Sequence, residues 1–403
     1  MKRKTKIAIG RGNIELKFTG FFLLLLLTTF NRINHFNAAS TTQYRSVICG
    51  IILLYTLLTC TKSIYKRILF ILPYLSIIFI SGTINYGFND NLLNSIITIL
   101  VIYETFILVE KYIQESGVDT FINLIYWFLL IFIFTVDISV FKVSNTGGGT
   151  IDVSTLYFSG DKFSVAYLHL MFLGILGVKF NLRRNNSKKR KFVFLLVWIY
   201  SFIICMEIDC GTGQIGLLIF LFVNILNKHI ISKLAKPFIY ISNLLVLSYI
   251  YVFSSFFMNF EIVKKFIVDF LGKDLSLTGR VEIYSSLMPI IKNSLIWGYG
   301  NATRIVAEVV GYGNAQNGIL HIIIQFGFVG AIALLFIVYK ALKTLNYNDK
   351  TYTKPLIAFL YAMLMCSLAE ICLDYNFIFG IAIIYSIGKN TSRQKRVDNK
   401  NYR

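Results

Sequence analysis

Twelve long apolar stretches, separated by short polar segments, constrain this 403-residue chain more than any other feature of its sequence. An α-helix needs about 20 apolar residues to cross a bilayer. The stretches are continuous rather than alternating, which excludes a membrane β-barrel. We therefore expect an all-α polytopic membrane protein with about 12 transmembrane helices. The stretches lie near 14–30, 46–61, 67–82, 91–110, 120–141, 163–181, 192–209, 211–227, 237–258, 317–339, 355–373 and 374–388.

The composition supports a membrane protein and excludes other classes. Hydrophobic residues make up 56% of the chain and charged residues 15%, whereas soluble domains contain about 25% charged residues. A soluble globular enzyme, a disordered protein and a fibrous repeat are thereby excluded. The six cysteines fall within or beside the apolar stretches and have no metal-ligand spacing, so we expect no metal and no cofactor.

The distribution of positive charge predicts an orientation. The net charge is +20, and 30 of the 40 Lys and Arg residues fall on one side if the N-terminus is placed inside and the stretches alternate. Lys and Arg resist translocation, so this side is the cytoplasmic one and both termini are expected there. The charge is thus explained by the membrane, and we expect no nucleic acid partner.

The same topology divides the chain into four parts. A loop as long as the one before the last three stretches is usually functional, and its apolar residues favour short helices on the outer membrane surface. The parts are 1–258 with the first nine transmembrane helices, 259–316 as an extracytoplasmic loop with interfacial helices, 317–388 with three more transmembrane helices, and 389–403 as a basic cytoplasmic tail.

The long loop contains a pattern suited to binding an anion. Thr278 is a plausible N-cap for a helix over Thr278–Ile291, which places Arg280 in its first turn. Free backbone N–H groups and a guanidinium together suit the oxygens of a pyrophosphate. The alternative is a surface arginine that meets lipid headgroups.

A second polar group follows the first. Tyr299, in the segment Asn293-Ser294-Leu295-Ile296-Trp297-Gly298-Tyr299-Gly300, suits a membrane interface. Asn317, His321 and Gln325 are spaced four residues apart and predict one polar stripe descending into the membrane from Gln316. Such a stripe forms either a site or hydrogen bonds between helices.

These motifs, in this order, resemble those of a known family. Thr-Gly-Arg, Asn-x-Leu-x-x-Gly-Tyr-Gly, Ala-Gln-Asn-Gly and Gly-Phe-Val-Gly follow one another over Leu277–Gly330. The order and the large outer loop are similar to those of the O-antigen polymerase and ligase superfamily, which contains Wzy-type polysaccharide polymerases and WaaL-like ligases. The resemblance implies a GT-C-like membrane glycosyltransferase of the bacterial cytoplasmic membrane that works without a metal.

The resemblance also implies a substrate and residue roles. The donor would be an undecaprenyl-diphosphate-linked oligosaccharide, and the family's loop arginine maps onto Arg280. A chain-length regulator and a flippase of the same pathway would be partners. Ligase-like members usually carry His-Asn where this chain has Gln316-Asn317. Because Gln cannot act as a general base, the group that activates the acceptor is left open.

Other polar residues are predicted on the outer half of the membrane. Lys162 begins a helix, as in a polymerase element with a Gly-x-Lys stretch, and can touch phosphate or anchor at the interface. Glu207 and Asp209 lie in a tight hairpin, where they can activate a sugar hydroxyl or be solvated turn acids. Asp137 and Asp374 have similar positions at helix ends.

We expect a polymerase that joins lipid-linked repeat units into capsular, O-antigen or exopolysaccharide at the outer face of the membrane. Arg280 would bind the donor pyrophosphate, and a carboxylate or His321 would accept the hydroxyl proton. One alternative is a ligase that transfers glycan to another acceptor. Another is a flippase or other transporter, although transporters often show internal repeats, and none is evident here.

Overall fold

A computed structural model describes residues 8–30, 38–87, 90–145, 157–182, 188–253, 280–345 and 352–401. For 8–17, 38–41, 90, 143–145, 280–282 and 392–401 it describes the backbone alone. The secondary structure of these ranges is helical, apart from one isolated antiparallel bridge between Tyr157 and Gly160. The prediction of an all-α fold is confirmed.

Each of the twelve predicted stretches falls on a helix. The helices are α1 (Ala8–Thr28), α2 (Ala38–Thr59), α3 (Lys62–Ile68), the 3-10 turn η1 (Leu69–Ile71), α4 (Leu72–Tyr86), α5 (Asp90–Ser116), α6 (Val118–Asn145), α7 (Lys162–Leu182), α8 (Lys188–Glu207), α9 (Gly211–Ile225), α10 (Lys228–Leu234), α11 (Pro237–Val252), α14 (Arg280–Asn293), α15 (Ile305–Val310), α16 (Gly318–Thr344), α17 (Thr353–Ala369) and α18 (Tyr375–Asn401). The last helix continues into the segment that was predicted as a separate basic tail.

Fewer helices meet a strict test of length and apolarity. Within the described ranges, five are long and apolar enough to cross a membrane, or six if the α10–α11 pair, bent by 71°, is one span. The five are Lys62–Tyr86, Asn91–Ser116, Val118–Lys142, Lys162–Leu182 and Gly318–Thr344. Three further apolar helices, including α9 and α17, are shorter. The fold is compatible with a multi-pass membrane protein, and twelve crossings remain a prediction.

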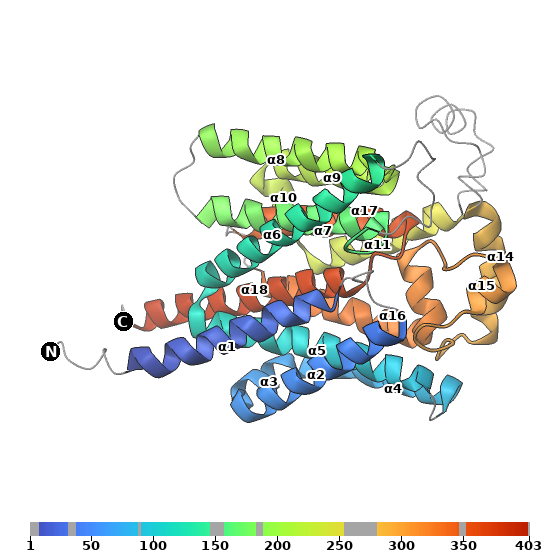
Figure 1. The fold of residues 1–403 in the computed structure, drawn as a ribbon, viewed down its shortest axis with the longest axis horizontal. Helices are drawn as coiled ribbons and strands as arrows, with labels where there is room; N and C mark the ends of the chain where they lie inside the picture. The colour runs from blue at the N-terminus through green and yellow to red at the C-terminus, as the bar shows by residue number, and fades with distance from the viewer. Residues whose placement is uncertain are drawn as a thin grey trace.

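The helices form one bundle with two distinct ends (Figure 1). The chain termini lie at one end, and the short helices α14 and α15 lie at the opposite end. In the interior, α17 packs against α7 and α9, while α18 packs against α5 and α16. Large apolar side chains are exposed on the outer helices, among them Leu58 (85%), Phe134 (67%) and Phe238 (76%). Such a surface suits lipid rather than water.

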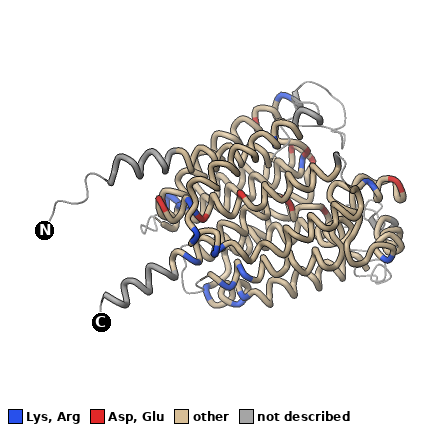
Figure 2. The backbone as a smooth tube through the Cα atoms, turned by 90° about the horizontal axis from the view of Figure 1, so that it is seen from below, with Lys and Arg blue, Asp and Glu red and all other residues tan. Residues whose placement is uncertain are grey.

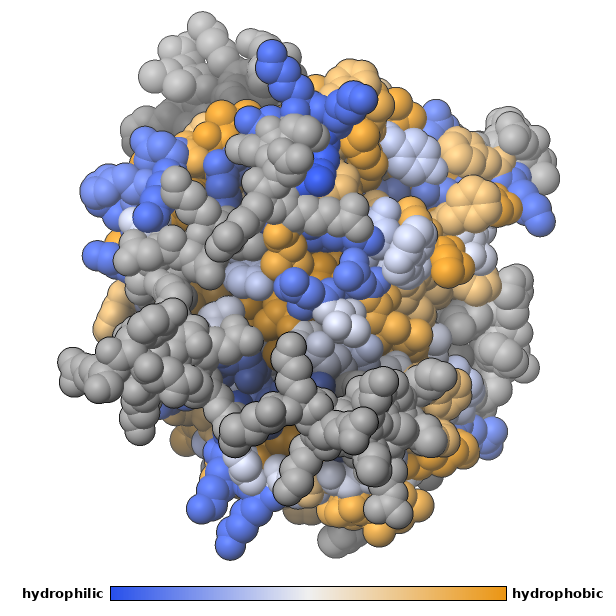
Figure 3. Space-filling model, turned by 90° about the vertical axis from the view of Figure 1, so that its left-hand side faces the viewer, coloured by the Kyte–Doolittle hydropathy of each residue, from blue (hydrophilic) through white to orange (hydrophobic). Residues whose placement is uncertain are grey.

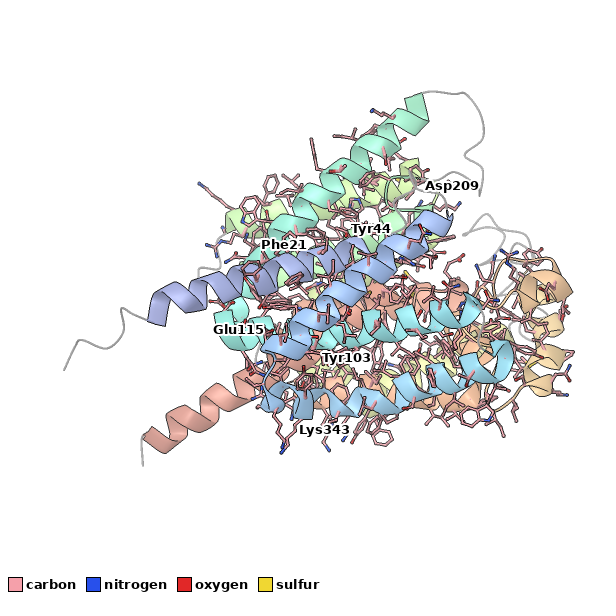
Figure 4. All side chains as sticks on the ribbon, turned by 60° about the horizontal axis from the view of Figure 1, so that its bottom comes forward. Phe21, Tyr44, Tyr103, Glu115, Asp209 and Lys343 are labelled. Carbon is pink, nitrogen blue, oxygen red and sulfur yellow. The ribbon has the colours of Figure 1, made fainter. Side chains whose placement is uncertain are left out.

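Lys and Arg gather toward the end that carries the termini (Figure 2). Glu115 and Lys343 lie at that end, whereas Asp209 lies toward the opposite one (Figure 4). This is the asymmetry that the charge pattern predicts. Below, the end with the termini is called the basic end, and the end with α14 and α15 is called the loop end.

Helix α16 is broken near the loop end, and this break shapes the candidate site. Gly327 has φ 67° and ψ −175°, a region open essentially to glycine alone. The segment 295–300 enters the gap: Tyr299 N–H donates to Ile324 O (2.8 Å), and Phe328 N–H donates to Leu295 O (2.9 Å). The backbone groups freed by the break therefore have partners, as an apolar environment requires.

Candidate functional site

A cavity of about 170 Å³ lies beside the first half of α16. Its polar lining comes from α4, α5, the loop before α15, α16, the connection from α17 to α18, and the start of α18. Its lining residues are Tyr74, Thr98, Ile102, Asn301, Gly318, His321, Ile322, Gln325, Phe326, Ile371, Leu373, Asp374, Tyr375 and Ile378. Since one water occupies about 30 Å³ of liquid, the cavity has room for several waters or a small polar group.

His321 is a polar side chain of this wall with a ring nitrogen that lacks a partner. It lies in the second turn of α16 and is partly buried. Among the described residues, its Nδ1 is buried without a hydrogen-bond partner. A buried ring nitrogen without a partner is costly, so such a group is a candidate for contact with a ligand or water.

Asp374 faces the same cavity from the connection between α17 and α18. Its Oδ1 accepts hydrogen bonds from the N–H groups of Asn376 (3.0 Å) and Phe377 (3.3 Å), so it caps α18. Burial raises the pKa of Asp374 to about 6, and the N–H groups that it accepts from oppose this rise. A carboxyl group with a pKa near neutrality is suited to proton transfer.

A chain of hydrogen bonds fixes the wall between these two residues. Asn301 Nδ2 donates to Thr98 Oγ1 (2.8 Å), and Thr98 Oγ1 lies 3.0 Å from Tyr375 Oη. Tyr86 Oη donates to Asn301 O (2.9 Å). The loop before α15 is therefore held against α4 and α5, and α5 is in turn held against the start of α18.

Helix α14 is attached directly to the start of α16. Tyr284 Oη donates to Gln316 O at 2.9 Å. Arg280 begins the same helix one turn earlier, about 6 Å along the axis at 1.5 Å rise per residue. The Arg280 side chain and the whole of Thr278 lie outside the described residues. The expectation of a helix that starts near Arg280 is met by the backbone.

Three predicted binding residues have structural contacts instead of lining the cavity. Asn317 is fully buried, caps α16 by accepting from Leu320 N–H (3.1 Å), and donates to Leu368 O (3.0 Å). Tyr299 Oη donates to Ile290 O (2.9 Å). Gln316 adopts φ 46° at the turn into α16. Of the predicted stripe, His321 and Gln325 line the cavity, whereas Asn317 faces α17.

The remaining predicted residues gather at a different place. Lys162 Nζ donates to Asp209 O at 3.0 Å and lies 4.0 Å from Asp209 Oδ2. Glu207 and Asp209 are exposed. Lys162 therefore joins the start of α7 to the turn between α8 and α9, and Glu207 ends α8 beside this turn. None of the three residues lines the cavity.

Asp137, which was predicted near the end of a helix, forms one buried network with His169. His169 Nε2 lies 3.2 Å from Asp137 Oδ1, and its Nδ1 lies 3.0 Å from Ser201 Oγ. Tyr200 Oη donates to Asp137 Oδ2 (2.6 Å). Asp137, His169 and Ser201 are almost completely buried. Although the residue types are those of a hydrolase triad, no substrate can reach the serine, so the network joins α6, α7 and α8.

The sequence did not indicate that Thr98, Asn301 and Tyr375 share a site with His321. For Asp374, the only local signal of a site in the sequence is its position as a polar residue at the end of an apolar stretch. In comparisons with known proteins, no family model and no curated protein matches the chain. The motif resemblance therefore supports a proposal and does not establish a family.

Proposed function

We propose that the protein is a polysaccharide polymerase that joins undecaprenyl-diphosphate-linked repeat units. The observation that carries this proposal is the cavity at the loop end, where His321 and Asp374 face a common space beside the attachment of α14. A polymerase needs a proton acceptor next to an anion-binding group. Asp374 and His321 are the candidate acceptors in the cavity wall, and Arg280 at the start of α14 is the proposed anion-binding group. The twelve crossings, the GT-C-like fold and a bacterial cytoplasmic membrane location belong to the same proposal.

In this mechanism the acceptor hydroxyl oxygen attacks the anomeric carbon of the donor sugar. The bond from that carbon to the diphosphate oxygen breaks, and undecaprenyl diphosphate leaves with the electron pair. Asp374 takes the hydroxyl proton, because its pKa of about 6 leaves it mostly ionised at neutral pH. Arg280 stabilises the charge that develops on the leaving diphosphate. His321 donates to or accepts from the acceptor sugar.

The first test removes the planar guanidinium group of Arg280, which can donate two parallel hydrogen bonds to a phosphate. Arg280→Lys keeps the charge but loses bidentate recognition of phosphate. We expect roughly a hundredfold loss of polymer formation from lipid-linked repeat units by the purified, reconstituted protein. Arg304→Lys is the matched control, because Arg304 is an exposed arginine of the same region. Equal activity of both variants would remove Arg280 from the mechanism.

A transporter of lipid-linked sugars is the second candidate, and the broken helix α16 favours it. Discontinuous helices recur at the substrate sites of secondary transporters. The same reconstituted vesicles discriminate the two functions. A polymerase lengthens glycans on one side of the membrane, whereas a transporter moves unchanged units across it.

A further inference from the structure

A second cavity, of about 560 Å³, lies at the basic end of the bundle. Its lining residues are Lys62, Ser63, Lys66, Arg67, Tyr385 and Lys389. They come from α3, along nearly its whole length, and from the middle of α18, more than 300 residues apart in the chain. We call this cavity the basic pocket. Figure 3 faces this end of the molecule and shows hydrophilic side chains beside hydrophobic ones.

The charges of the basic pocket are unbalanced. Arg67 Nη1 lies 2.6 Å from Glu110 Oε1, so its charge is neutralised by a fully buried carboxylate. Lys62, Lys66 and Lys389 are exposed, and none forms an ion pair within the described part of the chain. No described acidic residue lines the pocket. Three like charges around one space repel each other unless an anion is bound between them.

The floor of the pocket is rigid. Tyr385 Oη donates to Arg67 O at 2.6 Å, and the Tyr385 ring lies 4.4 Å from that of Phe70. The Arg67–Glu110 pair ties α3 to α5. The pocket is therefore held open by the packed helices rather than formed by surface lysines that happen to be close.

Apolar surface adjoins the pocket on one side. One face of the helix carries Lys62, Lys66 and Leu69, because these residues are spaced four and three positions apart. Leu69 is 52% exposed, and Leu72 and Phe79 continue the exposed apolar surface along the same span. A ligand that fits both surfaces has an anionic head and an apolar tail.

We propose that the basic pocket binds the phosphate headgroup of an anionic phospholipid, whose acyl chains lie along Leu69, Leu72 and Phe79. Cationic pockets between helices attract such headgroups through charge, and the adjoining apolar face supplies contact with the chains. Lipid binding at this site does not require the proposed polymerase activity, and the site lies at the opposite end of the bundle.

The test measures lipid binding by the purified full-length protein in a non-ionic detergent. Dioctanoyl phosphatidylglycerol should raise the melting temperature, whereas dioctanoyl phosphatidylcholine should not. In the double variant Lys62→Gln, Lys66→Gln we expect the Kd for phosphatidylglycerol to rise about tenfold. The control is Lys228→Gln, Lys233→Gln, which removes two exposed lysines from α10 and should leave the Kd unchanged.

Two further measurements separate the sources of the phosphate. Inorganic phosphate at the same concentration should give no shift; a shift as large as that from the lipid would overturn the lipid assignment. The single variant Lys389→Gln reports on the pocket if the double variant fails to fold. An unchanged Kd in a folded pocket variant, or an equal loss in the α10 control, would overturn the proposal.

Discussion

At the scale of single residues, Asp374 has two structural roles that favour opposite protonation states of its carboxyl group. As the cap of α18 it accepts hydrogen bonds from backbone N–H groups, which favours the carboxylate. As part of a cavity wall it is partly buried, which favours the neutral acid, and this effect is the larger one, because the pKa rises to about 6. The residue is thus poised to exchange a proton near neutral pH.

Through Asp374, activity and stability should respond to rising pH in opposite directions. Under the proposed mechanism, activity should rise as the pH passes about 6, because Asp374 must be ionised to act as the base. The raised pKa means that the folded state binds the proton more tightly than the unfolded state, whose pKa is near 3.8. The contribution of Asp374 to stability is therefore fully present below about pH 4 and lost as the pH rises through 6.

Asp374→Asn separates these effects. Asn caps helices about as well as Asp, so the variant should fold. We expect roughly a hundredfold loss of polymer formation and a melting temperature that lacks the decline between pH 4 and 6. Asp119→Asn, an exposed acid far from the cavity, is the control. An active variant with the wild-type pH profile would assign the proton to another group.

His321→Gln then tests the neighbouring residue. Gln keeps hydrogen bonds but cannot take a proton at neutral pH. If Asp374 is the base, His321→Gln should retain much of the activity, while His321→Ala should lose most of it. Inactive His321→Gln in a folded protein would instead make His321 the proton acceptor. Both variants are compared with the wild type by the rate of polymer formation as a function of pH.

At the scale of elements, the break in α16 explains why two separate motifs occur together. Gly298 and Gly327 face each other, and a Cβ on Gly298 would lie 2.5 Å from Gln325 C. The segment 295–300 and the break at Gly327 therefore form one unit, on which the cavity wall at Gln325 and Phe326 depends.

Gly327→Ala should strongly destabilise this unit. A Cβ there would lie 1.8 Å from Ile296 O, and the backbone conformation is itself strained for alanine. Gly311→Ala is the matched control, because Gly311 also has positive φ (78°) but no atom within 4 Å of its Cβ position. We expect about 1 kcal/mol for the control and clearly more for Gly327→Ala, measured by thermal unfolding. Equal losses would mean that the contact with Ile296 can relax freely.

At the scale of the whole molecule, the two ends differ in charge and in structure. The loop end carries α14, α15 and the cavity, whereas Lys and Arg gather at the basic end (Figure 2). If the positive-inside rule orients the chain, the loop end faces outward.

Thiol labelling tests this orientation. Glu308→Cys on α15 should react with a membrane-impermeant maleimide in intact cells, because Glu308 is exposed at the loop end. Lys228→Cys on α10 should react only after lysis. The native cysteines are buried or half-buried, so the unmodified protein gives the background. The reverse pattern of labelling would invert the topology and exclude the proposed mechanism.

Helices were predictable from the sequence, and the site was predictable only in part. Apolar runs specify helices locally, so all twelve stretches were found. His321 was a candidate because its helical spacing is also local. The cavity, however, joins Thr98, Asn301 and Asp374 through packing between distant segments, which no local pattern encodes. The sequence also could not show that the Asn317 side chain faces α17 rather than the cavity, because this orientation depends on its hydrogen bond to Leu368 O.

Helix α18 connects the two cavities. It is capped by Asp374 and starts at Tyr375 beside one cavity, and it carries Tyr385 and Lys389 into the other, about 22 Å further along its axis. If α18 shifts as a rigid body, ligands at its two sites are thermodynamically linked. By reciprocity, a lipid that tightens substrate binding is itself bound more tightly by the substrate-loaded protein, by the same factor. Under the proposed function, membrane composition would then change how tightly the lipid-linked substrate is bound.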